Sequence, residues 1–287
     1  MADVVVIGGA NIDIKAKSNN RSILGTSNPG EVTLSPGGVG RNIAHNLARL
    51  GVDVALVSIV GNDAHGDLLI EATSSAGVDV DAISRQSIAT GTYVAMLDSN
   101  GELVTALSDM RAVEVITPEF MANHTDKLQA ARLVVADCNL PLATLHAIAA
   151  IVADKLVIET VSVPKCEKLL HVAAKNPILL TMPNIDQVEQ LTGTRDIHKA
   201  LEMLHQRGIQ NIVIHAGAEG AFVSDRENTN HVPTRTTANI VDVTGAGDAA
   251  VAGLIFGLLQ GENLEVAAAR GQQQAARVIA SSRSTLD

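Results

Sequence analysis

The sequence of 287 residues contains no tryptophan, one tyrosine and three phenylalanines. Proteins that bind single-stranded nucleic acids use aromatic side chains as stacking platforms for the bases, and this chain has few of them. Its formal net charge of −10 also opposes binding to a phosphate backbone, which attracts basic proteins. We therefore expect no nucleic-acid partner. Any nucleobase that binds must be held by aliphatic side chains and hydrogen bonds.

Cysteines and long apolar runs are also scarce. Cys138 and Cys166 form no metal-ligand pattern, so we expect both to be reduced. No apolar run is long enough to cross a bilayer. The chain enters a strand-like run, Val4–Ile7, with no basic segment before it. These features predict a soluble, cytoplasmic protein with no membrane partner.

Strand-like and helix-like segments alternate along most of the chain, which predicts one doubly wound α/β domain over residues 1–287. Apolar runs such as Val4–Ile7 and Val54–Val60 are typical of parallel strands that are buried on both faces. Further strands are expected at Leu133–Ala136, Leu156–Glu159, Ile178–Thr181, Ile212–His215, Ala221–Ser224 and Ala238–Val243. Helices are expected up to about residue 50 and at about 66–75, 143–153, 184–192, 196–207, 246–259 and 263–280.

Two segments, residues 14–36 and 90–109, interrupt this alternation. The second contains Thr92–Leu97 and Leu103–Leu107 around an Asn-Gly pair, which is typical of a β-hairpin. Two separate β-rich segments can pair into one small sheet, and we predict that this sheet is a lid over a site. The alternative is two unrelated surface hairpins.

The residues Thr244-Gly245-Ala246-Gly247-Asp248 stand at the start of a long apolar helical stretch. Glycines allow a sharp turn, and the free N–H groups of a helix N-terminus together with the helix dipole favour an anion. A carboxylate beside such an anion site is costly unless it has a function. The pattern predicts that Asp248 accepts a proton from a hydroxyl that attacks a phosphoryl group. A Gly-rich turn whose aspartate only complements the dipole is the alternative.

Polar residues also follow the first predicted strand. Asn11 and Asp13 stand near its carboxyl end, where open α/β sheets bind their ligands. A second glycine motif, Gly37-Gly38-Val39-Gly40-Arg41-Asn42, opens a helix whose buried face includes Ile43 and Leu47. A simple polar turn would explain Asn11 and Asp13 equally well if they stood alone.

With these two glycine motifs the sequence resembles the PfkB (ribokinase-like) carbohydrate kinase family over essentially its whole length. The resemblance implies a three-layer α/β/α fold with a mostly parallel central sheet and a small β-sheet lid. It also implies ATP as phosphoryl donor and a small-molecule nucleoside or sugar as acceptor. Stretches such as Ser27-Asn28-Pro29-Gly30 and Ser108-Asp109-Met110 are similar to the pseudouridine kinases of this family. The implied reaction is phosphorylation of the 5′-hydroxyl of pseudouridine.

The resemblance assigns roles to individual residues. Asp248 is the expected base, and Gly245, Ala246 and Gly247 form the expected anion hole. The residues expected at the substrate are Asn11, Asp13, Gly38, Asn42 and, from the lid hairpin, Asp109. Those expected at ATP are Asn184, Gly217, Gly220 and Thr244. Mg²⁺ should be bound mainly through water. A monovalent cation such as K⁺ is expected near Asp242 and the loop Ala280–Ser284.

The sequence departs from the family pattern on the metal and phosphate side. Gln187 stands where relatives carry the glutamate of an Asn-x-x-Glu motif, so hydrated Mg²⁺ should be held less well. Met182 replaces a lysine, and Glu159-Thr160 replaces Asp-Pro. Two interpretations stay open: a working kinase with an altered Mg²⁺ network, or a protein that binds its ligand without turnover. Another nucleoside or sugar as substrate is a further alternative. The resemblance also suggests a homodimer formed through the lid strands.

Overall fold

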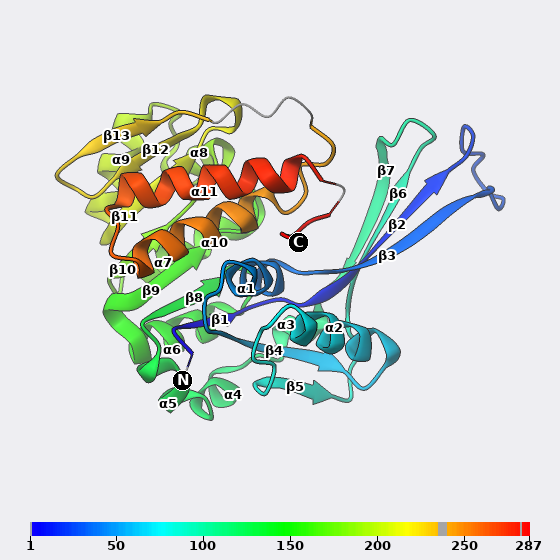
Figure 1. Cartoon of the computed structure of the whole chain (residues 1–287), viewed down its shortest axis with the longest axis horizontal. Helices are drawn as coiled ribbons and strands as arrows, with labels where there is room; N and C mark the ends of the chain where they lie inside the picture. Colours follow the sequence, from blue (N-terminus) through cyan, green and yellow to red (C-terminus); the bar gives the residue numbers. More distant parts are fainter. Residues whose placement is uncertain (1, 235–239, 282) are drawn as a thin grey trace.

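The computed structural model describes residues 2–234, 240–281 and 283–287. Its large sheet has nine strands in the order β13-β12-β11-β10-β9-β8-β1-β4-β5. The strands from β11 to β5 run parallel, whereas β12 and β13 are antiparallel at one edge (Figure 1). In sheet order the strands are β13 (Thr229–Val232), β12 (Ala221–Ser224), β11 (Ile209–His215), β10 (Ile178–Thr181), β9 (Leu156–Glu159), β8 (Leu133–Asp137), β1 (Val4–Ile7), β4 (Val54–Gly61) and β5 (Ile83–Gln86).

Helices cover both faces of this sheet, which gives three layers. One face carries α1 (Val39–Arg49), α10 (Ala246–Leu259) and α11 (Leu264–Ile279). The other carries α3 (Arg111–Glu114), α4 (Pro118–Ala122), α5 (Thr125–Ala130), α6 (Leu142–Val152), α7 (Val163–Ala173), α8 (Ile185–Thr192) and α9 (Ile197–Gln206). Helix α2 (Ala64–Ser75) packs near the start of the smaller sheet, and two 3₁₀ turns lie at Ala153–Lys155 and Gly217–Glu219.

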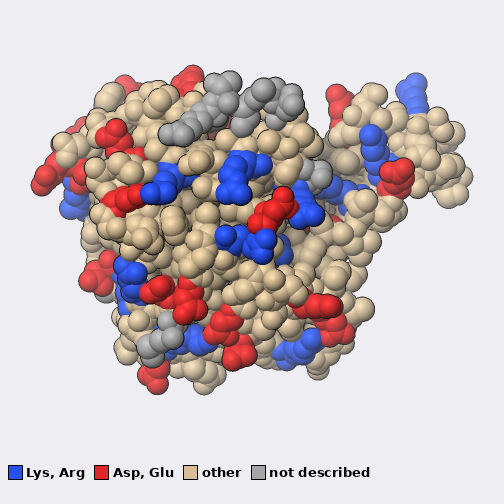
Figure 2. Space-filling model, in the orientation of Figure 1, with Lys and Arg blue, Asp and Glu red and all other residues tan. Residues whose placement is uncertain are grey.

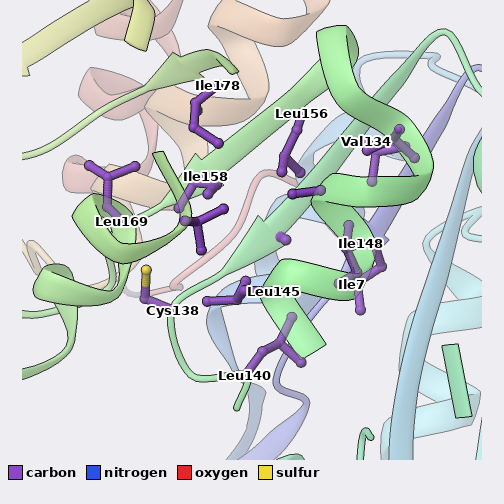
Figure 3. Close-up of a cluster of buried hydrophobic side chains, with 14 of the residues drawn as sticks. Ile7, Val134, Cys138, Leu140, Leu145, Ile148, Leu156, Ile158, Leu169 and Ile178 are labelled. Atoms are coloured by element: carbon purple, nitrogen blue, oxygen red, sulfur yellow. The ribbon is translucent and has the colours of Figure 1, made fainter. Parts of the chain in front are cut away.

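The alternation of side chains along the central strands explains the layers. In β1, Val4 and Val6 are buried in the cluster beneath α1 and α10, while Val5 and Ile7 are buried in the cluster beneath α6. Figure 3 shows Ile7 beside Leu145 and Ile148 of α6. A strand that is apolar at every position must therefore be covered on both faces, as the sequence predicted.

The smaller sheet has the order β3-β2-β6-β7 and projects from the body of the molecule (Figure 1). Its strands are β2 (Asn11–Ser18), β3 (Gly30–Gly37), β6 (Gly91–Leu97) and β7 (Leu103–Asp109). They arise from the two segments that interrupt the strand–helix alternation, so those segments pair with each other and are not separate hairpins. The role of this sheet as a lid stays a prediction.

The predicted three-layer fold with its smaller sheet is confirmed, but several local predictions were wrong or incomplete. Helix α7 was not predicted, although Pro164 in its first turn and the buried Cys166 and Leu169 signal it. The short edge strands β5 and β13 were also missed, because they are polar and lack an apolar run.

The strand predicted at Ala238–Val243 is wrong for residues 240–243, which form no strand; residues 238–239 lie outside the described residues. The N–H groups of Val241 and Asp242 donate to the carbonyl oxygen of Ile279, at 2.8 and 3.4 Å. The segment therefore pairs with the end of α11 instead of with a sheet edge.

Acidic and basic side chains are interspersed on the face shown in Figure 2, and no single basic surface appears there. Among the described residues, no helix is long and apolar enough to cross a membrane. Both cysteines are free and buried. The predicted compartment stays a prediction.

Candidate active site

The turn after β1 and the start of α1 are in direct contact. Gly38 has φ 97°, and a Cβ atom there would lie 2.4 Å from the carbonyl oxygen of Gly9. Only glycine combines this backbone conformation with so close an approach. The contact places Asn11 and Asp13, which follow the turn, beside the helix that carries Asn42.

Asp137, at the end of β8, joins the same two segments. Its Oδ2 accepts hydrogen bonds from the N–H groups of Gly9 (2.9 Å) and Gly40 (3.2 Å), and its Oδ1 accepts one from Asn139 (2.8 Å). Burial raises the pKa of this carboxyl, and the bonds from the backbone oppose that rise. Sequence reasoning missed Asp137, although an aspartate at the carboxyl end of an apolar strand was the available signal.

Asn11 and Asp13 form a pair at the start of β2. The Nδ2 of Asn11 donates to Oδ1 of Asp13 at 2.6 Å. A Cβ atom at Gly37 would lie 2.2 Å from Oδ2 of Asp13, so a larger residue there would displace this carboxylate. Burial raises the pKa of Asp13, and the hydrogen bond from Asn11 and the charges of Lys15 and Arg41 oppose it.

A tight turn opens α10. Gly245 has the left-handed conformation (φ 78°), and a Cβ atom there would lie 1.9 Å from the carbonyl oxygen of Ser284. No side chain caps the helix, and a Cβ atom at Gly247 would meet nothing within 4 Å. The helix start therefore presents its dipole and N–H groups to open space, as an anion site requires.

Asp248 lies in the first turn of α10, and Asn42 of α1 donates from Nδ2 to its Oδ2 at 2.9 Å. Burial raises the pKa of Asp248 to about 7, the hydrogen bond from Asn42 opposes this, and the charges of Asp137 and Asp13 add to it. A carboxylate that titrates near neutrality at an anion site suits a general base.

Arg41 is buried with only 3% of its surface exposed, which sequence reasoning did not predict. Its Nη1 donates to the carbonyl oxygen of Pro36 (3.2 Å) and to Oδ1 of Asn42 (3.1 Å). Burial lowers its pKa to about 10, so it keeps its charge at neutral pH. Because Arg41 binds the amide oxygen of Asn42, the amide nitrogen is directed toward Asp248.

A cavity of about 300 Å³ lies between α10, α11 and the ends of β9 to β11. Its lining includes Asn184, Gln187, Gly217, Gly220, Gly247 and Asp248. The residues predicted at the nucleotide, except Thr244, therefore share one cavity with the predicted base. Thr244 lines a neighbouring cavity of about 260 Å³ together with Asp13 and Lys15.

Asn184 and Gln187 form a capping box at the start of α8. Oδ1 of Asn184 accepts from the N–H of Gln187 at 2.9 Å, and Oε1 of Gln187 accepts from the N–H of Asn184 at 2.8 Å. The hydroxyl of Thr160 also donates to Oε1 of Gln187, at 2.8 Å. The amide oxygen of Gln187 is thus already used by two donors, which makes it a poor acceptor for a hydrated metal.

Glu159 lines the same cavity at the end of β9. Burial raises its pKa to about 8, a hydrogen bond from Val161 opposes the rise, and the charges of Asp248 and Asp137 contribute to it. The described residues contain no cluster of three or more His, Cys, Asp or Glu side chains that could hold a metal directly. The neighbouring carboxylates of Glu159, Asp248 and Asp137 nevertheless supply negative charge that suits a hydrated Mg²⁺ bound with the nucleotide phosphates.

Two predicted site residues have partners that sequence reasoning missed. Asp109 forms a bidentate pair with Arg111 (2.9 and 2.6 Å), whose hydrogen bonds lower its pKa to about 2. Asp109 pairs with Thr92 and thus lies on the face of the smaller sheet opposite to that of Asp13, so the structure does not bring the two together. Asp242 lies 2.8 Å from the Nζ of Lys15, a residue of β2. The other part of the expected cation site includes residue 282, which lies outside the described residues.

The comparisons with known proteins show the family of the chain. A model of the pfkB family of carbohydrate kinases matches residues 1–287, the whole chain. The chain is 38% identical over 258 residues to the pseudouridine kinase of Escherichia coli, covering 88% of this chain and 82% of that protein. It is 28% identical over 299 residues to the guanosine-inosine kinase of Exiguobacterium acetylicum, covering 100% and 97%.

Among solved structures, an Arabidopsis thaliana ribokinase complexed with ribose and ATP superposes with a TM-score of 0.88. The two chains are 23% identical, and the match covers 98% of this chain and 94% of the other, which shows a shared fold. The chain therefore belongs to the pfkB family of carbohydrate kinases and is a nucleoside or sugar kinase with a ribokinase-like fold that uses ATP to phosphorylate a hydroxyl group.

Proposed function

We propose that this kinase phosphorylates the 5′-hydroxyl of pseudouridine. The observation that carries the proposal is the 38% identity to a pseudouridine kinase, which extends over 88% of the chain. Two hydrogen-bonded pairs, Asn11–Asp13 and Asn42–Asp248, support a ribose site beside the proposed catalytic base, and the charge of Asp13 acts on Asp248. Their roles as substrate ligands stay predictions.

The lid favours a nucleoside over a free sugar. Tyr93, the only tyrosine of the chain, pairs with Asp13 across strands β2 and β6, so both side chains project from the same face of the small sheet. A half-buried aromatic ring beside the ribose ligands supplies a surface on which a base can pack. The lid therefore contributes both polar groups for a ribose and one apolar surface for a base.

In the proposed reaction the substrate hydroxyl oxygen forms a bond to the γ-phosphorus of ATP, and the bond from that phosphorus to the leaving oxygen of ADP breaks. Asp248 accepts the hydroxyl proton as this transfer proceeds. The N–H groups at the start of α10 stabilise the charge on the transferring phosphoryl group. Asn42 keeps the carboxylate in place, and its own orientation is set by Arg41.

Bound Mg²⁺ supplies positive charge to the nucleotide phosphates. We propose that Glu159 holds it through water, because Glu159 lines the cavity and Gln187 has its amide oxygen occupied. A cation would also relieve the repulsion between Glu159 and Asp248. The replacement of the family glutamate by Gln187 thus weakens the binding of Mg²⁺ and leaves the carboxylate of Glu159 to hold the ion.

The outer face of the lid supports the proposal of a homodimer. Val32, Leu34, Met96 and Leu107 are 49–74% exposed, and their strand register places them on the face opposite to Asp13. Such an apolar surface commonly marks a protein interface. A monomer in sedimentation analysis at micromolar concentration would contradict this proposal.

Substrate identity is tested by ADP release from the purified protein with pseudouridine, uridine, inosine, guanosine and ribose. We expect kcat/KM for pseudouridine to exceed that for the others by at least about tenfold. Tyr93→Ala should lose more activity with nucleosides than with ribose. A preference for inosine or guanosine would contradict pseudouridine as the substrate. It would instead indicate a purine nucleoside kinase, an alternative that the similarity to a guanosine-inosine kinase favours. Substrate binding without any ADP release would indicate that the replacement of the family glutamate by Gln187 prevents turnover.

The pKa of Asp248, the proposed catalytic base, sets the expected pH dependence of kcat/KM. Because the pKa of Asp248 is raised to about 7, the carboxylate form that accepts the proton is lost below that pH. At saturating Mg²⁺, which keeps Glu159 ionised, we expect kcat/KM to be constant above pH 7 and to fall about tenfold per unit below it. Glu159→Gln, assayed at saturating Mg²⁺, should keep this acidic limb. A flat profile from pH 5.5 to 8 would contradict the assignment.

The Mg²⁺ proposal is tested by two substitutions. Glutamate can replace Gln187 in the capping box, because its carboxylate also accepts from Asn184 and Thr160. Gln187→Glu should lower the Mg²⁺ concentration for half-maximal turnover, and Glu159→Gln should raise it, each by about tenfold. Gln190→Glu, on the exposed side of the same helix, is the matched control. Unchanged Mg²⁺ dependence in Glu159→Gln would rule out this role for Glu159.

A further inference from the structure

An ion pair connects the lid to the loop that precedes the anion site. The Nζ of Lys15, on β2, lies 2.8 Å from Oδ2 of Asp242, although the two residues are 227 positions apart. Both side chains are mostly shielded from solvent, with 39% and 28% exposed. Lys15 projects from the same lid face as Asp13, because the two residues are two positions apart on one strand.

The other oxygen of Asp242 also accepts hydrogen bonds. Its Oδ1 accepts hydrogen bonds from the N–H (2.9 Å) and the hydroxyl (2.7 Å) of Thr244, which directly precedes Gly245. Burial would raise the pKa of Asp242, but the hydrogen bonds from Lys15 and Thr244 bring it below its ordinary value. Asp242 is therefore an anion that fixes the turn leading into α10.

The carboxylate of Asp242 does not fit the monovalent cation that the family resemblance implied. Oδ2 is bound by an ammonium group, and Oδ1 is bound by two donors of Thr244. A K⁺ ion would have to displace Lys15, and both would compete for one negative charge. A tethered ammonium has the advantage that it loses no translational freedom when it pairs.

We infer that Lys15 is a positioning residue of this kinase, and that its ammonium group takes the place of a monovalent cation at Asp242. From there it orders the turn Thr244–Gly247 and sets the distance between this turn and the lid face that carries Asp13. The inference rests on the kinase activity of the family and not on pseudouridine as substrate.

This arrangement has a functional consequence. The substrate lies between groups from two sources: the lid supplies Asp13, and the α10 turn supplies the anion hole and Asp248. Misplacement of such groups by about 1 Å can cost on the order of 100-fold in rate. The Lys15–Asp242 pair directly links the two sources, so its loss should lower kcat more than it raises KM.

The test compares wild type with Lys15→Ala, Lys15→Met and Lys17→Ala, using the best substrate of the panel. Each enzyme is assayed in N-methylglucamine chloride, NaCl and KCl at equal ionic strength. Lys17→Ala is the matched control, because Lys17 is on the same strand and face but is exposed. Lys15→Met keeps the length of the side chain and removes its charge.

We expect wild type and Lys17→Ala to differ by less than about twofold between N-methylglucamine and K⁺. Lys15→Ala should lose on the order of 10–100-fold in kcat in N-methylglucamine and recover several-fold in KCl, because the vacated space admits the ion. Lys15→Met should lose activity without recovery. Strong K⁺ stimulation of wild type, or full activity of Lys15→Ala in N-methylglucamine, would contradict the inference.

Thermal unfolding supplies a readout that needs no turnover. KCl should give a saturable rise in Tm for Lys15→Ala that NaCl and N-methylglucamine do not give, and no such rise for wild type. If no substrate of the panel is phosphorylated, this measurement still decides the role of Lys15 separately from the proposed function. A Lys15→Ala protein that K⁺ neither stabilises nor reactivates would overturn the replacement.

Discussion

The hydrogen bond from Asn42 to Asp248 is the contact on which the site depends. It joins residues 206 positions apart and sets the start of α1 against the start of α10. Glycines also permit a close backbone approach at the start of each helix: Gly38, before α1, lies against Gly9, and Gly245, before α10, lies against Ser284. One bond thereby holds the carboxylate that we propose as the base at a helix N-terminus, beside the residues that follow β1.

Negative charge is concentrated around this contact, and the structure balances it with buried donors. Asp137 is satisfied by backbone N–H groups, Asp248 by Asn42, and Asp242 by Lys15. The buried Arg41 supplies a permanent positive charge among them. Glu159 and Asp248 keep raised pKa values because burial outweighs these compensations. Both carboxyl groups are costly to ionise in the free protein. They are therefore suited to bind a metal cation or to accept a proton during the reaction.

The sequence predicted the parts of this protein that local patterns encode. Val4–Ile7 is apolar at every position and is a buried central strand, and Asn100-Gly101 marks the β6–β7 hairpin. The helix starts at the two glycine motifs were also predictable. Asp137 and Lys15 were missed because their partners lie far along the chain: Asp137 bonds Gly9 across 128 positions, and Lys15 bonds Asp242 across 227. No periodicity or spacing reports such a contact. The predicted strand was wrong at residues 240–243 for a similar reason, since the end of α11 supplied the hydrogen-bond acceptor of Val241 and Asp242.

The most direct test of the account is to replace Asp248 by asparagine and to measure substrate binding by calorimetry together with ADP release. Asparagine has nearly the same shape and can still pair with Asn42, but it cannot accept the hydroxyl proton. Substrate affinity should stay within a few-fold of wild type, while kcat falls by roughly 10²–10⁴-fold. Undiminished turnover with intact binding would show that Asp248 is not the base and would contradict the central claim.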